Sequence, residues 1–203
     1  MLAVGLVLTG LTTGCGSQGA RNTIKLGGNL EMTGESASYG ISSRNGIELA
    51  LKEQNEKGGV LDKKVELVVA DNKSEATEAT NAMQKLIPQD RVIGVIGPNL
   101  SSVVIASTAV SGAAKTADIS PTGTNPQVTV DGLGKVKPYN FRACFIDPFQ
   151  GTVMAHFALN TPKVKRAAIM IDNSSDYSKG LAQFFKKQFE KGGGEVVAEE
   201  VYL

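Results

Sequence analysis

The clearest candidates for ligand chemistry lie in the middle of the chain, directly after a short apolar run. The β-branched run over residues 92–96 predicts a buried strand, a Gly-Pro pair ends it, and Ser101 and Ser102 begin an apolar helix. A helix that begins at the carboxyl end of a parallel strand has unpaired N–H groups and the positive end of a dipole. A ligand carboxylate could bind there through backbone donors and a seryl hydroxyl. The alternative is that the two serines only cap the helix.

The elements that would position these serines alternate between strand and helix along the chain. Apolar runs and helical spacing predict strands over 23–30, 65–70, 92–96, 118–120, 140–145, 165–171 and 195–203, and helices over 39–57, 74–87, 101–115, 147–160 and 178–191. Strict alternation implies parallel sheets with helices on both faces, so we predict the α/β class. Ser74 is the expected N-cap of the second helix.

Composition limits the kinds of partner. The chain carries 21 basic and 20 acidic residues for a net charge of +1, and aromatic residues make up only 5%. We therefore expect no nucleic-acid partner. A metal site is not expected either, because the single histidine, His156, has no second ligand at helical spacing. We predict no cofactor, and we expect Cys144 to be a buried, inert thiol.

The first residues have the character of a targeting segment. Residues 1–11 are apolar and uncharged, and residues 11–17 resemble the cleavage region of a lipoprotein signal peptide, with Cys15 as the lipidated residue. We therefore predict a signal peptide over residues 1–14 and a small, polar tether over residues 15–22. The alternative is an apolar start with no targeting role. Residues 23–142 are then a first α/β domain, and residues 143–203 begin a second one.

Several short motifs occur in an order that resembles a known family. They are Thr33-Gly34, Gly46 to Ala50, Asn55 with Lys57 to Val60, Gly94 to Pro98, Ile119 to Pro126, Phe141-Arg142 and Gln150-Gly151. Together they resemble the branched-chain amino acid ABC transporter substrate-binding proteins of the type I periplasmic-binding-protein fold. The resemblance implies two α/β domains that close on a small carboxylate such as an amino acid. It also implies an extracytoplasmic, monomeric receptor that delivers the ligand to an ABC permease, and the predicted signal peptide adds a lipid anchor on Cys15.

The resemblance also implies roles for single residues. Ser101 and Thr124 match the family's carboxylate-binding hydroxyls, and Thr122 matches a position whose main chain contacts the ligand. Tyr39 and Tyr177 match aromatic residues that cover the ligand. Ser102 is a further candidate for ligand binding. The alternatives are that the threonines stabilise a turn and that the tyrosines only pack. The family's acidic partner for the ligand ammonium would lie beyond Leu203, so we expect the 203-residue chain to bind weakly or not at all. The second domain is expected to be incomplete.

Two other classes of function compete with transport. The same ligand module could act as a sensor whose closure signals to a receptor or regulator. A nucleotide-dependent enzyme is disfavoured, because residues 94–97 do not form a G-x-G-x-x-G sequence and no G-x-x-x-x-G-K-[ST] sequence occurs. We therefore predict a protein that is not an enzyme.

Overall fold

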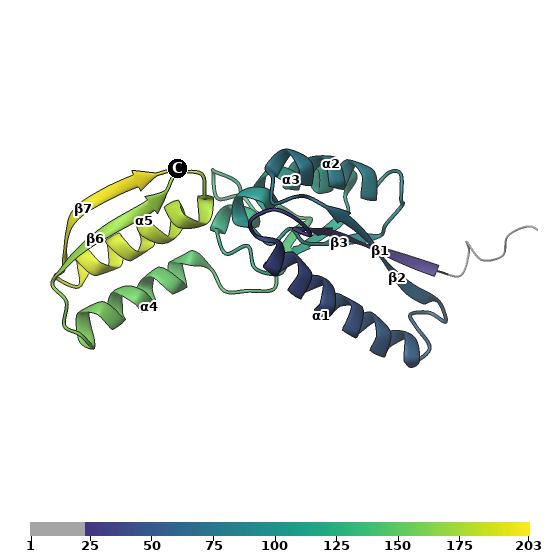
Figure 1. Cartoon of the computed structure of the whole chain (residues 1–203), viewed down its shortest axis with the longest axis horizontal. Helices are drawn as coiled ribbons and strands as arrows, with labels where there is room; N and C mark the ends of the chain where they lie inside the picture. The colour runs from purple at the N-terminus through teal and green to yellow at the C-terminus, as the bar shows by residue number, and fades with distance from the viewer. Residues whose placement is uncertain (1–22) are drawn as a thin grey trace, which may run out of the picture.

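The first lobe of the protein is a five-stranded parallel sheet with helices on both faces. The computed structural model describes residues 23–203. The strands are β1 (Thr23–Leu30), β2 (Lys64–Asp71), β3 (Gly94–Ile96), β4 (Ala117–Ser120) and β5 (Asn140–Arg142), in the order β2-β1-β3-β4-β5. Figure 1 shows α1 (Ala37–Glu56) on one face and α2 (Ala76–Leu86) with α3 (Ser101–Ala114) on the other. This arrangement confirms the predicted α/β class.

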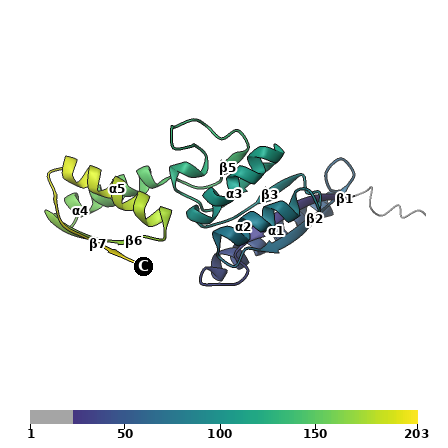
Figure 2. The same ribbon diagram turned by 90° about the horizontal axis from the view of Figure 1, so that it is seen from above.

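The second lobe consists of two parallel strands and two helices. Strands β6 (Arg166–Asp172) and β7 (Glu195–Tyr202) pair with each other, α5 (Asp176–Lys191) packs on them, and α4 (Asp147–Asn160) packs on α5. Figures 1 and 2 show the two lobes joined by the stretch between β5 and α4. Helix α4 lies tightly against α5 at Gly151, where an added Cβ would lie 2.7 Å from the backbone nitrogen of Phe185.

The core of the first lobe lies between α2 and the sheet. Met83 and Leu86 of α2 pack against Val92 and Val95, and all four side chains are buried. Met83 and Leu86 stand at helical spacing in α2, and Val95 lies within β3. Burial of apolar area therefore holds the helix against the sheet.

The structure corrects three local expectations. Strand β3 begins at Gly94 rather than at residue 92, because Arg91 has φ +58° and the Val92 N–H bonds to the Leu86 carbonyl. Ile93 is consequently 66% exposed, so the run is not covered on both faces. Helix α2 begins at Ala76, two residues later than expected, with Glu75 as its N-cap; Ser74 has φ +64° and does not cap it.

The proposed boundary between residues 142 and 143 falls directly after β5, before α4 begins. It stays a prediction, as does the incomplete second domain. The signal peptide, the tether and the lipidated Cys15 lie outside the described residues. Within residues 23–203, no helix combines the length and apolarity needed to cross a membrane. The same range contains no gathering of histidine, cysteine, aspartate or glutamate side chains suited to a metal ion.

Candidate functional site

The six residues singled out from the sequence line one cleft of about 690 Å³ between the two lobes. Its first wall is formed at the carboxyl ends of β3 and β4, and its second wall by the segment after β6 and the start of α5. Open α/β sheets bind ligands at this edge of the sheet. The six are Tyr39, Ser101, Ser102, Thr122, Thr124 and Tyr177.

The first turn of α3 offers free backbone donors to this cleft. Its N-cap is Leu100, whose side chain cannot cap, and neither Ser101 nor Ser102 caps the helix. No hydrogen bond within residues 23–203 uses the N–H groups of Ser101, Ser102 or Val103. The alternative in which the serines only cap α3 is therefore wrong. Three unpaired N–H groups and the positive end of the α3 dipole favour an anion at this point.

The Ser101 hydroxyl is positioned to donate to the same place. Its side chain is buried, and its Oγ accepts a hydrogen bond of 3.2 Å from the backbone N–H of Asn125. The hydroxyl proton is not used by a partner in the described part of the chain. Ser101 therefore links α3 to the loop after β4 and keeps its own proton available for a ligand.

The loop after β4 brings two threonines with different roles. Thr122 Oγ1 donates toward the carbonyl oxygen of Asn99 at 3.0 Å and lies 3.2 Å from Asn99 Oδ1, so its proton is already used. Thr124 is only 6% exposed, and its Oγ1 has no hydrogen-bond partner among the described residues. A buried hydroxyl without a partner is uncommon and costs free energy. Thr124 is therefore a hydroxyl available to a ligand, with the nearby Asp147 carboxylate as the competing acceptor.

The threonine loop is held in place by residues around the first lobe's last strand. Arg142 donates to the carbonyl oxygens of Gly123 and Pro126, at 2.8 and 3.2 Å. Asp147 lies beside this loop with both carboxylate oxygens buried and without partners. Burial raises the pKa of Asp147, while the nearby Thr124 hydroxyl and the Arg142 charge oppose that shift. The two hydrogen bonds from Arg142 thus hold the loop in place.

The two tyrosines come from opposite lobes. Tyr39 in α1 is 55% exposed, and Tyr177 in α5 is 37% exposed. The Tyr177 hydroxyl accepts a hydrogen bond of 2.9 Å from Gln150 Nε2, which fixes the direction of its ring. Both rings line the cleft, so each could cover a ligand bound at the start of α3.

A model of the family described as "Periplasmic binding protein" matches residues 23–203. This chain belongs to the periplasmic binding protein family. The Leu/Ile/Val-binding protein BraC3 of Rhizobium johnstonii is 36% identical to it over 183 residues, which cover 90% of this chain and 48% of that protein. The chain therefore spans about half the length of the curated relatives it matches.

Solved structures in the family have the same fold. The branched-chain amino acid transporter substrate-binding protein LivJ of Streptococcus pneumoniae, in complex with isoleucine, has a TM-score of 0.80 and 37% identity and matches 89% of this chain and 50% of its own. A solute-binding protein of Rhodopseudomonas palustris, in complex with 3,4-dihydroxybenzoic acid, has a TM-score of 0.78 and 26% identity, with coverage of 89% and 47%. These three names describe binding proteins and no enzyme.

Sequence reasoning missed two polar residues of this periplasmic binding protein, Glu31 and Asn99. Glu31 follows β1, and its Oε1 accepts from the backbone N–H groups of Asn99 and Leu100 at 2.9 and 3.3 Å. Its Oε2 accepts from Asn99 Nδ2 at 2.7 Å. An acidic residue directly after an apolar strand, at the sheet edge where ligands bind, was the available signal.

Cys144 departs from its expected place in the periplasmic binding protein. It is half-buried rather than buried, and it lines the cleft. Desolvation raises the pKa of its thiol, and the nearby Arg142 charge opposes that shift. A raised pKa keeps the group a thiol at neutral pH, so its predicted inertness stays a prediction.

Ser102 contacts the second lobe of the periplasmic binding protein. Its Oγ accepts a hydrogen bond of 2.8 Å from the N–H of Asp176, the first residue of α5. The carbonyl oxygen of Asp176 accepts from Asn125 Nδ2 at 2.7 Å. The backbone N–H and the backbone carbonyl of Asp176 are therefore both hydrogen-bonded to the first lobe. Ser102 thus holds the lobes together at the cleft.

Replacing Ser102 with alanine is expected to speed amide hydrogen exchange at Asp176 about three- to tenfold, because one hydrogen bond contributes about 0.5–1.5 kcal/mol. NMR-detected exchange on the 203-residue chain measures this directly. Ser107→Ala is the matched control, because Ser107 lies in the same helix and its hydroxyl only donates to the Val104 carbonyl. Unchanged exchange at Asp176 in Ser102→Ala would contradict the assigned contact.

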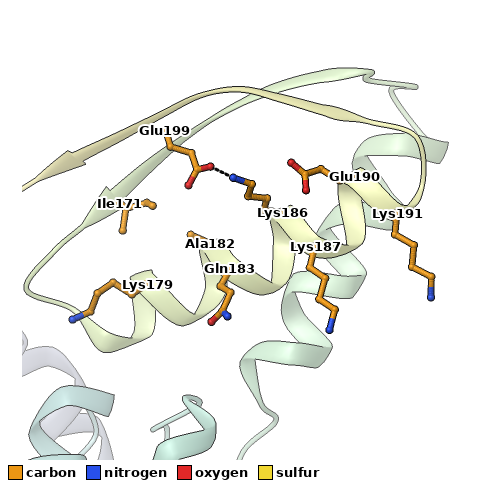
Figure 3. Close-up of a pocket in the computed structure, with 9 residues that line it drawn as sticks. All are labelled: Ile171, Lys179, Ala182, Gln183, Lys186, Lys187, Glu190, Lys191 and Glu199. Carbon is orange, nitrogen blue, oxygen red and sulfur yellow. Dashed lines mark hydrogen bonds and ion pairs between the residues drawn. The ribbon is translucent and has the colours of Figure 1, made fainter. Parts of the chain in front are cut away.

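A second hollow, of about 620 Å³, lies along α5 in the second lobe (Figure 3). Lys186 pairs there with Glu199 of β7, which raises the pKa of Lys186, while Lys187 and Lys191 extend away from Glu199. The hollow is lined mostly by long charged side chains and contains no hydroxyl group. None of the six predicted residues lies there, so the cleft between the lobes is the candidate site.

Proposed function

We propose that this chain forms the ligand-binding cleft of a solute receptor that captures an amino acid with a branched aliphatic side chain. The observation that carries the proposal is the convergence of three unpaired N–H groups of α3 with the unpartnered Thr124 hydroxyl in one cleft. The isoleucine in the LivJ complex and the name of BraC3 support a branched-chain ligand. In this proposal the protein binds its ligand without chemical change.

In the proposed binding mode, the ligand carboxylate lies at the start of α3. It accepts hydrogen bonds from the helix N–H groups and from the hydroxyls of Ser101 and Thr124, and the lobes close over it with Tyr39 and Tyr177. Hydrogen bonds to a charged group contribute roughly 1.5–3 kcal/mol each. Three of them give about 4.5–9 kcal/mol before the costs of desolvation and ordering, whereas micromolar binding needs about 8 kcal/mol net. The ligand's ammonium and side chain must therefore add to the affinity.

The proposal includes a place and partners for the protein. The receptor acts outside the cytoplasm as a monomer and delivers its ligand to an ABC permease. A lipid on Cys15 would anchor it to the membrane; this residue lies outside the described part of the chain. Metabolic labelling with radioactive palmitate tests the anchor, because Cys15→Ser should abolish incorporation. Incorporation that persists in that variant would contradict it.

The ligand class is tested in the extended protein, by which we mean this chain continued to the full length of its relatives. Isothermal titration calorimetry should give micromolar or tighter binding for at least one of leucine, isoleucine and valine, and much weaker binding for 3,4-dihydroxybenzoate. The 203-residue chain alone should bind these amino acids weakly. Tight binding of the aromatic acid alone would contradict the proposed ligand class.

Ser101→Ala in the extended protein is expected to weaken amino-acid binding by roughly 1–3 kcal/mol, because it removes one donor to the carboxylate. Calorimetry measures the affinity, and thermal unfolding without ligand should show only a modest fall in melting temperature, because the Asn125 N–H loses its acceptor. Ser107→Ala is the control, since that buried hydroxyl of α3 bonds within the helix. A large fall in melting temperature without a specific loss of affinity would assign Ser101 a structural role.

A further inference from the structure

A buried carboxylate stands directly behind the proposed anion site. Strands β1 and β3 are parallel neighbours, and Gly28 of β1 pairs with Ile96 of β3. The residue three positions after Gly28 therefore lies beside the residue three positions after Ile96. These residues are Glu31 and Asn99, and both are fully or almost fully buried. Sheet register therefore delivers Glu31 to the start of α3, on the protein side of the cleft.

The hydrogen-bond partners of Glu31 are those that a carboxylate requires. Its two oxygens accept three hydrogen bonds, from the backbone N–H groups of Asn99 and Leu100 and from Asn99 Nδ2. All three partners are donors, and a proton on Glu31 would have no acceptor among them. The outermost amides before α3 are thus occupied by the protein's own anion, and only the next three N–H groups face the cleft.

The charges that line the cleft have one sign. Among the described residues that line it there are three acidic side chains, Glu35, Glu75 and Asp172, and no lysine, arginine or histidine. Glu35 and Glu75 are exposed to solvent, which screens their charges. Glu31 does not line the cleft but lies fully buried behind it. Its charge therefore acts on a bound ligand with less screening by solvent than the charges of Glu35 and Glu75.

We infer that Glu31 is a specificity-determining residue that makes the cleft reject carboxylates lacking a positive charge. An anion bound to the N–H groups of α3 must lie near a second, buried anion on the same helix end. A zwitterion offsets this repulsion with its ammonium group, and a simple carboxylate cannot. The inference rests on the proposed function, since it concerns the ligand of the same site.

The experiment compares leucine with 4-methylpentanoate, which is leucine without its amino group, by calorimetry on the extended protein. The wild type should bind leucine at least one hundredfold more tightly. Glu31→Gln should reduce this ratio about tenfold, because it removes the buried charge and keeps an oxygen that can accept from Asn99 and Leu100. Glu35→Gln, a charge removed from the exposed rim of the same cleft, should change the ratio less than twofold.

Glu31→Asp separates charge from shape. It keeps the charge on a shorter side chain, so affinity can fall while the ratio between the two ligands stays at the wild-type value. The inference is overturned if Glu31→Gln weakens both ligands equally, since that result is what a purely structural role predicts. It is also overturned if the wild type binds both ligands within threefold, a measurement that needs no variant.

Failure of the inference and of the proposed function are distinguishable. If the wild type binds amino acids and the ratio does not respond to Glu31→Gln, only the role of Glu31 is wrong. If the wild-type extended protein binds neither compound nor any other amino acid, the proposed function falls, and the inference falls with it.

Discussion

Replacing Gly97 with alanine is expected to lower the free energy of unfolding by about 2–6 kcal/mol. Gly97 has φ +96°, a conformation that costs a residue with a side chain about 1–3 kcal/mol. An added Cβ would also lie 2.2 Å from the carbonyl oxygen of Asn29, an overlap that forces β1 and β3 apart at a further cost of about 1–3 kcal/mol. The stability of a typical domain is only 5–15 kcal/mol, so this is a large loss.

Urea unfolding of the 203-residue chain, followed by circular dichroism, measures the effect of Gly97→Ala. Gly46→Ala is the control, and we expect it to raise the free energy of unfolding instead of lowering it. Gly46 lies within α1, is exposed, and has no heavy atom within 4 Å of an added Cβ. Alanine there should stabilise the helix by about 0.5–1 kcal/mol. If Gly97→Ala unfolds at the wild-type urea concentration, the close contact between β1 and the turn after β3 is wrong.

Replacing Asp118 with asparagine is expected to stabilise the protein, and to do so more strongly at pH 8 than at pH 5. Asp118 lies in β4 and is almost completely buried. Burial raises the pKa of its carboxyl group to about 7, although weak hydrogen bonds from Asn140 and Ser111 and the Lys137 charge oppose the shift. One of its oxygens, Oδ1, has no partner among the described residues.

The direction of the pH effect follows from proton binding. Between the ordinary pKa of 3.8 and the raised value of about 7, the folded protein holds a proton on Asp118 that the unfolded chain has released. Stability therefore falls as pH rises through this range and is level above it. Each pKa unit corresponds to about 1.36 kcal/mol. The free energy of unfolding of the wild type should therefore fall by about 2–3 kcal/mol between pH 5 and pH 8 because of this carboxyl group.

The measurement is the urea midpoint of the wild type and of Asp118→Asn at both pH values. The difference between the two proteins isolates this carboxyl group from others, including Asp147, whose pKa burial also raises. Asparagine can still accept the hydrogen bonds from Asn140 Nδ2 and Ser111 Oγ. A difference that is the same at pH 5 and pH 8 would show that Asp118 does not titrate in this range.

Local pattern was sufficient to predict most of the elements. The predicted bounds of β1 and α4 agree with the structure, because an apolar run in one and an Asp-Pro start in the other are read from neighbouring residues alone. Ser74 shows the limit of this reasoning. A serine before a helix usually caps it, but here the backbone takes a left-handed turn in which Ser74 Oγ accepts from the Ser36 N–H.

The candidate site was predicted in part, and the missing part depends on contacts between distant segments. Residues 101 and 124 follow strands that end at the same sheet edge, so their meeting could be expected from alternation. The contact between Glu31 and Asn99 requires β1 to lie beside β3, an order that alternation does not reveal. The contact of Ser102 with α5 requires the placement of the second lobe, which no local pattern contains.

A crystal structure of the extended protein with bound leucine tests the central claim most directly. We predict a carboxylate oxygen of the ligand within hydrogen-bond distance of the N–H groups at residues 101–103, and the Thr124 hydroxyl donating to the same carboxylate. A ligand bound elsewhere in the protein, or one whose carboxylate points away from α3 while water occupies these N–H groups, would contradict the account.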